Sequence, residues 1–287
     1  MIIERASEAA HWYAVENGIV VPRNVCKSAD GKKEINTTLR QARPKGYLPS
    51  VTSILMEMKS LALEKWKISM AVQAAMTIDR LPEEGLDAFV ERSMQDFAQV
   101  SDTYKEYGRR AHSICERIAK EHKLLSTDAD LEHIALMFWK WLDETAADVL
   151  FVEEMVAGYG YAGCVDLVIQ LKDGPVAIVD IKTQRPKAGK PFSAWESYAP
   201  QLVAYGDALA VCKNDLRFRH AKHINLMVSS DPEVHTIEAI EHEATETNRA
   251  RFLTTYLVWC LARGYFPPGF DSDYILDNLR RAMPREE

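Results

Sequence analysis

Apolar and polar positions in the first half of the chain repeat with helical spacing. The period predicts helices over residues 51–79, 83–122 and 128–148. The third segment contains "IALMFWKWL", which is apolar on most of its surface, so we expect that helix to be buried. Residues 1–49 are rich in Gly, Pro, Asn and Lys, a composition typical of irregular or hairpin structure.

The pattern then changes to short runs rich in β-branched residues and bounded by glycine. These runs predict strands at 149–157, 161–171 and 175–183. A helical period returns at 193–212, with Pro200 near its start.

A second pair of strands, 221–230 and 233–241, is followed by a last helix at 243–263. This order predicts an α/β fold with a central mixed sheet flanked by helices and a helical N-terminal part. We expect a single domain over 1–287, with an irregular and helical part at 1–148 and an α/β core at 149–287.

Composition narrows the class of protein only a little. The chain has 287 residues, 47% hydrophobic and 27% charged, which is ordinary for a globular protein. The N-terminus has no apolar stretch typical of a signal peptide, and no apolar run approaches membrane-spanning length. The five cysteines are scattered without CxxC spacing, which disfavours a zinc or iron–sulfur site and favours reduced, cytoplasmic thiols.

Net charge disfavours nucleic-acid binding, but local charge does not. The formal net charge is −7, and net charge does not report local patches. Basic residues cluster in three stretches, at 182–190, 217–222 and 40–45. A solvated surface explains any one of these clusters equally well.

The segment "GYGYAG" (158–163) matches a dinucleotide-binding fingerprint by its letters alone. That fingerprint requires the last glycine to open a helix. Here "CVDLVIQL" follows, which is typical of a strand. We therefore predict a turn between two antiparallel strands and no nicotinamide or flavin site.

The stretch "LVIQLKDGPVAIV" predicts a β-hairpin. A loop at 172–174 fits a type I turn followed by a left-handed glycine. Leu171 then opposes Pro175, and Asp166 opposes Asp180. A slip of one residue would send the two carboxylates to different faces, so the register is a sharp prediction.

Lys182 lies two residues beyond Asp180 and is expected on the same face as both carboxylates. Two adjacent carboxylates repel each other unless a cation lies between them, and oxygen-rich sites suit Mg²⁺ or Mn²⁺. A lysine beside such an ion can orient a water or stabilise a phosphoryl transition state. The alternative is a structural Asp–Lys pair on an exposed sheet face.

Other polar residues converge on this sheet. Glu153 and Glu154 occupy the preceding strand, so one of them must face the same side as Asp166. His112 and Glu116 are four residues apart and share one face of an upstream helix. A satisfied surface or core histidine is the commoner explanation for such a residue.

Five fragments in this order resemble the PD-(D/E)XK nucleases, in the RecB-like exonuclease branch. "GCVDLV", "VDIKT" and "QLVAY" are similar to the family core, and "GRRAHSICE" resembles its G-x-x-x-H-x-x-x-E segment. "LPSVTSIL" and "LEKWK" resemble mitochondrial genome maintenance exonucleases and related phage and prophage proteins. The resemblance covers about residues 11–210 and implies a restriction-endonuclease-like core.

The resemblance implies a role for each matching residue. Asp166 and Asp180 would bind Mg²⁺ or Mn²⁺ with the backbone carbonyl of Ile181, and His112 would complete the ligand set. Lys182 would position or activate the attacking water.

Supporting roles follow in the same way. Glu153 matches the strand glutamate of the family, with Glu154 as the alternative. Gln201 and Tyr205 match the QxxxY helix and would support the lysine or a phosphate, although packing also explains that pair. The family's Pro-Asp is Val-Asp here, and the cysteine group of iron–sulfur members is missing.

DNA contacts are expected on the segment that leaves the active-site strand and on an N-terminal turn. The candidates are Arg185, Lys187, Lys190, Trp195, Ser50 and Thr52. Basic side chains could hold the DNA backbone and Trp195 could stack on a base. Core packing for the aromatic residue and helix capping for the two hydroxyls are the alternatives.

The sequence thus predicts a metal-dependent DNA exonuclease that acts on single- or double-stranded ends. The resemblance implies a role in phage or bacterial DNA recombination, repair or degradation in the cytosol, with room for a single-strand annealing or recombination partner. An endonuclease with the same chemistry and a catalytically silent DNA-binding subunit remain alternatives.

Overall fold

A computed structural model provides the structure of the protein. It describes residues 11–28, 33–58, 61–125, 127–186, 189–231, 233–243 and 245–283. None of the helices in these ranges is both long enough and apolar enough to cross a membrane.

A five-stranded mixed sheet in the order β10-β9-β8-β7-β6 organises the molecule. Its strands are β6 (Ala146–Gly158), β7 (Tyr161–Leu171), β8 (Val176–Gln184), β9 (Lys222–Ser229) and β10 (Ile237–His242). Neighbouring strands are antiparallel except β8 and β9, which are parallel. The expected α/β architecture with a central mixed sheet is therefore confirmed.

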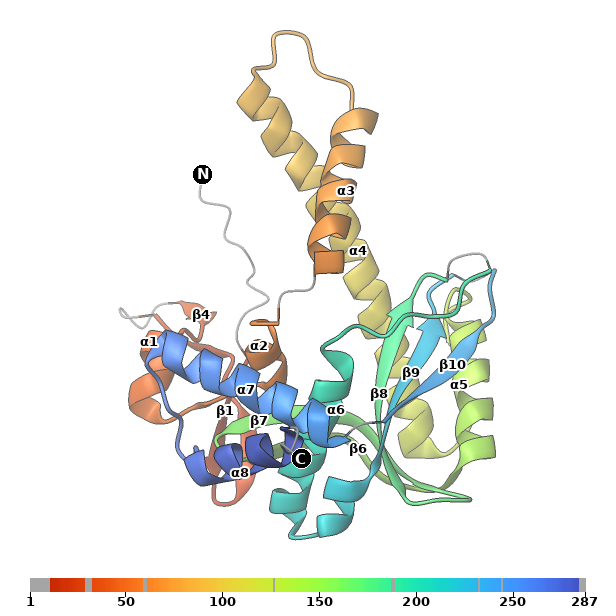
Figure 1. The fold of residues 1–287 in the computed structure, drawn as a ribbon. Helices are drawn as coiled ribbons and strands as arrows, with labels where there is room; N and C mark the ends of the chain where they lie inside the picture. The colour runs from red at the N-terminus through yellow and green to blue at the C-terminus, as the bar shows by residue number, and fades with distance from the viewer. Residues whose placement is uncertain are drawn as a thin grey trace.

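Helices cover both faces of this sheet (Figure 1). The crossover helix α6 (Tyr198–Lys213) links the parallel strands β8 and β9 and buries one face. The helices α4 (Leu86–Glu121) and α5 (Glu132–Thr145) pack on the other face through a second apolar cluster. Because β8 is covered on both sides, six of its nine residues are buried, as a central strand requires.

The glycine-rich segment forms a tight hairpin between β6 and β7. Tyr159 and Gly160 have φ of 53° and 84°, the positive pair that a two-residue type I′ turn needs. The predicted turn is confirmed.

The N-terminal strands pack against the C-terminal helices. The strands are β1 (Trp12–Glu16), β2 (Ile19–Pro22), β3 (Val25–Lys27), β4 (Glu34–Asn36) and β5 (Leu48–Pro49). Short helices follow at α1 (Leu39–Ala42), η1 (Arg43–Lys45) and α2 (Val51–Leu55). They share an apolar core with α7 (Thr245–Arg263) and α8 (Ser272–Ala282).

Several boundaries differ from the prediction. The expected helix over 51–79 is two helices, because α2 ends at Leu55 and α3 (Leu61–Thr77) follows. Residues 193–197 precede α6 and are not helical, and α8 was not anticipated. The helix expected to be buried, α5, buries only one face and leaves Leu136 52% exposed.

A helical arm projects from the body. It consists of α3 and the outer part of α4, joined through a turn at 78–85 (Figure 1). At that turn Arg92 binds the Glu84 carboxylate through two hydrogen bonds, of 3.0 and 2.9 Å. Large apolar side chains are exposed along both helices of the arm, namely Ile68, Val72, Met76, Leu86, Val90 and Met94.

Candidate active site

A row of polar residues crosses the middle of the sheet. The pairs Leu167–Val179 and Val168–Ile178 set the β7–β8 register, which places Asp166 opposite Asp180. The predicted register is therefore confirmed. The loop differs in detail, because Gly174 is not in the left-handed region that the predicted turn assigned to it.

The row extends to the strands on either side. Glu154 pairs with Val165 on β7, so Glu153 is level with Asp166. On the other side Asp180 pairs directly with Asn225 of the parallel strand β9. Four adjacent strands thus each contribute one polar residue at the same level.

Asp180 is buried and accepts hydrogen bonds from three side chains. Only 2% of the residue is exposed. Its Oδ1 accepts from Lys182 Nζ at 2.9 Å and from Gln201 Nε2 at 3.0 Å, and its Oδ2 accepts from Asn225 Nδ2 at 2.7 Å. Gln201 Nε2 also donates to the Tyr205 hydroxyl at 3.1 Å. The Gln201–Tyr205 pair therefore contacts the Asp180 carboxylate rather than the lysine.

Asp166 binds partners from the opposite layer. The strand pairing ends before Asp166, and there the Ile181 amide donates to Asp166 Oδ2 at 2.8 Å. His112 Nδ1 of α4 lies 3.5 Å from the same oxygen. Register alone predicted that both carboxylates share a face, but Asp166 contacts α4 whereas Asp180 contacts α6 and β9.

Electrostatics connects the two carboxylates. Burial, and next the charge of Asp180, hold the pKa of Asp166 well above its usual value, and Lys182 opposes this shift. Burial, followed by the Lys182 charge, lowers the pKa of His112, which favours the neutral imidazole. Neutral imidazole is the form that binds metal ions.

A close helix–strand approach positions His112. A Cβ on Gly108 would lie 3.1 Å from Thr183 Oγ1 of β8, so the glycine allows α4 to approach the sheet. Ala111 is fully buried in the next turn. This approach brings His112 Nδ1 to 3.5 Å from Asp166 Oδ2.

Glu153, rather than Glu154, lies at this site. Glu153 has a φ of 52° and lines a small pocket together with His112, Glu116 and Asp166. Burial raises the pKa of its carboxyl. The Glu154 side chain forms an ion pair with Lys213 of α6 instead.

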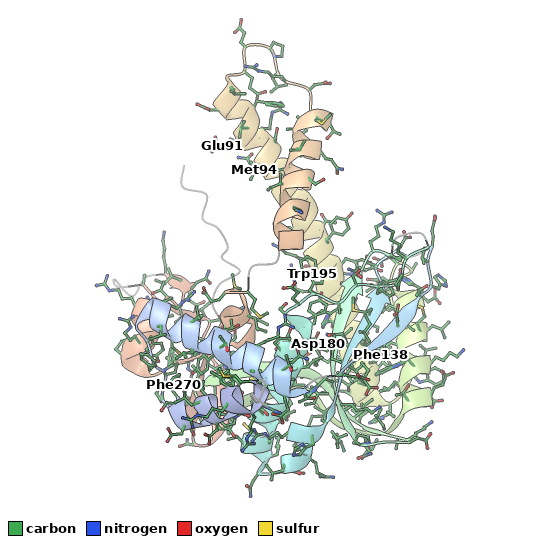
Figure 2. All side chains as sticks on the ribbon, viewed as in Figure 1. Glu91, Met94, Phe138, Asp180, Trp195 and Phe270 are labelled. Atoms are coloured by element: carbon green, nitrogen blue, oxygen red, sulfur yellow. The ribbon has the colours of Figure 1, made fainter. Side chains whose placement is uncertain are left out.

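Aromatic residues flank the lysine. Lys182 Nζ lies 5.3 Å from the centre of the Tyr198 ring, a cation–π distance. Trp195 is half-buried in the segment before α6 and lies between Asp180 and the base of the arm in the view of Figure 2. Phe192, which precedes Trp195, is buried.

The expected DNA-contacting residues fall into different environments. Arg185 and Lys190 are exposed, and Arg185 forms an ion pair with Asp231 at 3.4 Å. Lys187 lies outside the described residues. Ser50 is buried as the N-cap of α2, where it accepts a hydrogen bond from the Ser53 amide, and Thr52 is exposed.

The structure adds Asn225 and His242, which the sequence analysis missed. A lone asparagine in the apolar run "INLMVS" was a usable signal, because such residues are costly to bury unpaired. His242 Nε2 lies 2.6 Å from Asn225 Oδ1. Only the sheet order, which is not readable from local pattern, brings these residues beside Asp180.

The donor set fits a divalent cation such as Mg²⁺ or Mn²⁺. Burial, followed by the charge of Asp180, raises the pKa of Asp166, and a cation between the two carboxylates would relieve their repulsion. Within the described ranges, three or more His, Cys, Asp or Glu side chains do not gather closely enough to form a ready metal cluster. The Asp180 oxygens are instead held by amide and ammonium donors.

Comparison with known proteins supports the same chemistry. The family model of the PD-(D/E)XK nuclease superfamily matches residues 71–260, which include the whole polar row. A search of curated proteins found no match. Members of this superfamily are typically nucleases that use divalent metal ions, which supports nuclease activity on DNA. The chain belongs to the PD-(D/E)XK nuclease superfamily.

Proposed function

We propose that this protein is a Mg²⁺- or Mn²⁺-dependent DNA exonuclease of the RecB-like branch. The observation that carries the proposal is the meeting of Asp166, Asp180 and Lys182 with His112 of α4. The two carboxylates, the Ile181 carbonyl and His112 would hold the metal ion. A bound ion of this kind lowers the pKa of water and neutralises charge on the phosphate oxygens.

The protein side chains would supply orientation. Lys182 is held between Asp180 and the Tyr198 ring, so its ammonium group can orient a water or stabilise the charged transition state. Gln201 and Tyr205 keep the Asp180 carboxylate in place. Glu153 and Glu116 add negative charge at the mouth of the same pocket.

The proposed substrate path leaves the sheet beside Lys182. Exposed Lys190 and Arg185 would contact the DNA backbone, and half-buried Trp195 would stack on an unpaired base. The motif resemblance supports the preference for DNA ends. It also supports a role in phage or bacterial recombination, repair or degradation, with an annealing or recombination partner.

The test uses Asp180→Ala and Lys182→Ala, with Lys140→Ala on the exposed side of α5 as a matched lysine control. Substrates are 5′- and 3′-labelled single- and double-stranded oligonucleotides and a closed circle, each with Mg²⁺, Mn²⁺ or EDTA. We expect digestion of linear DNA only, loss of about 100-fold or more in both site variants, and wild-type activity in the control.

Each other outcome contradicts a specific part of the proposal. Cleavage of the closed circle would indicate an endonuclease. Full activity in both site variants would move the active site elsewhere. DNA binding by the wild-type protein without any cleavage would indicate a silent binding subunit.

A further inference from the structure

Asn225 occupies a position where a polar residue needs an explanation. It lies in the centre of β9, is 0% exposed and is surrounded along the strand by buried apolar residues. An unpaired amide at such a place would carry an uncompensated desolvation penalty. The hydrogen bonds of Asn225 must therefore offset this penalty.

The amide group of Asn225 has only one orientation that satisfies its surroundings. Nδ2 lies 2.7 Å from Asp180 Oδ2 and 3.4 Å from the Asp180 carbonyl oxygen, and both of these atoms are acceptors. The reverse orientation would place Oδ1 against two oxygens. The amino end of the side chain must therefore face Asp180.

His242 completes this arrangement from the next strand. Its Nε2 lies 2.6 Å from Asn225 Oδ1, and this oxygen must accept the hydrogen bond because it carries no hydrogen to donate. His242 therefore presents Nε2–H to the amide. Carboxylate, amide and imidazole form a continuous chain from β8 through β9 to β10.

We propose that Asn225 and His242 are positioning residues that fix the orientation of the Asp180 carboxylate. Asn225 holds Oδ2, Gln201 holds Oδ1, and His242 prevents the Asn225 amide from turning over. The two amides hold the Asp180 carboxylate from α6 and β9, in addition to the contacts that it makes with Lys182. This inference rests on the proposed function of the site.

The hydrogen-bond chain sets a clear expectation for turnover and for metal binding. Partners that hold a metal-binding carboxylate typically change metal affinity or activity by about 10–100-fold when they are removed. Asn225 is fully buried and cannot touch DNA. Its loss should therefore lower kcat and leave KM for DNA unchanged.

The experiment compares Asn225→Ala, His242→Leu and His242→Gln with the wild-type protein. The readouts are Mn²⁺ affinity without DNA, by calorimetry and electron paramagnetic resonance, and kcat and KM on a linear oligonucleotide. Because glutamine can supply an amide donor where Nε2 lies, His242→Gln should retain most of both properties. Asn225→Ala and His242→Leu should each lose about 10–100-fold in Mn²⁺ affinity and kcat, with KM unchanged.

His223→Leu is the matched control. It is the same chemical change as His242→Leu, at a 2% exposed histidine of β9 that pairs with His242 across the two strands. We expect it to bind Mn²⁺ and turn over DNA like the wild-type protein. The double variant Asn225→Ala/His242→Leu should be no worse than Asn225→Ala, because His242 acts through the asparagine.

Three results would overturn the proposal. The first is an unchanged Mn²⁺ affinity in folded Asn225→Ala. The second is an equal loss of Mn²⁺ affinity in His242→Gln and His242→Leu. The third is the absence of Mn²⁺ binding by the wild-type protein. If Asn225→Ala fails to fold, the two His242 variants still decide the outcome. If the wild-type protein binds Mn²⁺ but cleaves no DNA, and Asn225→Ala binds Mn²⁺ more weakly, the positioning role is supported and the nuclease proposal is rejected.

Discussion

Gly163 of β7 shows how a single missing side chain supports the site. A Cβ at this position would lie 2.5 Å from Cε1 of Tyr205, closer than two non-bonded carbon atoms can approach. The Tyr205 hydroxyl is bonded to Gln201, which in turn donates to Asp180. Gly163 thus leaves room for Tyr205, which holds Gln201 in reach of the Asp180 carboxylate.

We predict that Gly163→Ala displaces the Tyr205 ring and lowers both stability and nuclease activity. Overpacking of this kind costs about 1–3 kcal/mol, measured here by urea unfolding alongside the cleavage rate. Gly85→Ala is the matched control, because a Cβ at Gly85 meets no atom within 4 Å. Wild-type stability and rate in Gly163→Ala would show that Tyr205 has no part in holding the site.

At the residue scale, the sequence predicted the acidic and basic residues but not their partners. The pair Asp166 and Asp180 followed from the hairpin register, which the structure confirms. The burial of a lone asparagine could signal Asn225, but its pairing with Asp180 and His242 could not be predicted because these residues lie on other strands. Glu153 has a left-handed backbone conformation, which the alternation of a strand does not predict. The sequence therefore could not decide between Glu153 and Glu154.

The strand β9 carries a buried histidine, His223, whose protonation is linked to folding. Burial, followed by the charges of Arg249 and His242, lowers the pKa of His223 to about 4. The unfolded chain binds the proton with a pKa near 6.5. Stability from this neutral histidine is therefore complete above pH 6.5 and is lost as the pH falls towards 4.

We predict that the free energy of unfolding falls between pH 6.5 and 4, with a His223 contribution of at most about 3 kcal/mol. Urea unfolding at pH 7.5, 6 and 5 measures it. Because other groups also titrate, the difference between the wild-type protein and His223→Leu isolates this histidine. Identical pH dependence in both proteins would contradict the prediction.

At the element scale, most helices and strands followed from periodicity, and the errors have local causes. The break between α2 and α3 lies within a segment whose apolar spacing continues on both sides of it. Helix α8 was missed because the sequence after Gly264 contains Pro267 and Pro268 and reads as a tail. Its N-cap, Asp271, accepts from the Tyr274 amide at 2.8 Å, a short-range signal that was available.

Over the whole molecule, the N-terminal strands and the C-terminal helices form one packing unit. Trp12 is 1% exposed, and its ring centre lies 6.1 Å from that of Trp259 and 6.3 Å from that of Tyr265. The Tyr265 hydroxyl donates to the Tyr47 carbonyl at 2.8 Å. The first and last parts of the chain therefore depend on each other for burial.

We predict that Trp12→Ala lowers the free energy of unfolding by about 3–5 kcal/mol, whereas Trp12→Phe costs clearly less. The indole nitrogen is buried without a hydrogen-bond partner among the described residues, so replacing the indole by a phenyl ring leaves no hydrogen-bond acceptor unpaired. Guanidinium unfolding followed by circular dichroism measures both variants. An equal cost for Ala and Phe would show that ring packing is not the source of the stability.

The sequence by itself determined the fold class and the hairpin register, and it predicted the acidic and basic residues of the candidate site. These depend on local information, namely the periods 3.6 and 2, turn residues and residue type. Only the tertiary structure decided that Asp166 faces α4 while Asp180 faces α6 and β9, and that Asn225 and His242 join the site. The physical reason is that β8 and β9 are parallel strands connected through helix α6. Their pairing, and the contacts that follow from it, therefore depend on long-range packing and not on local pattern.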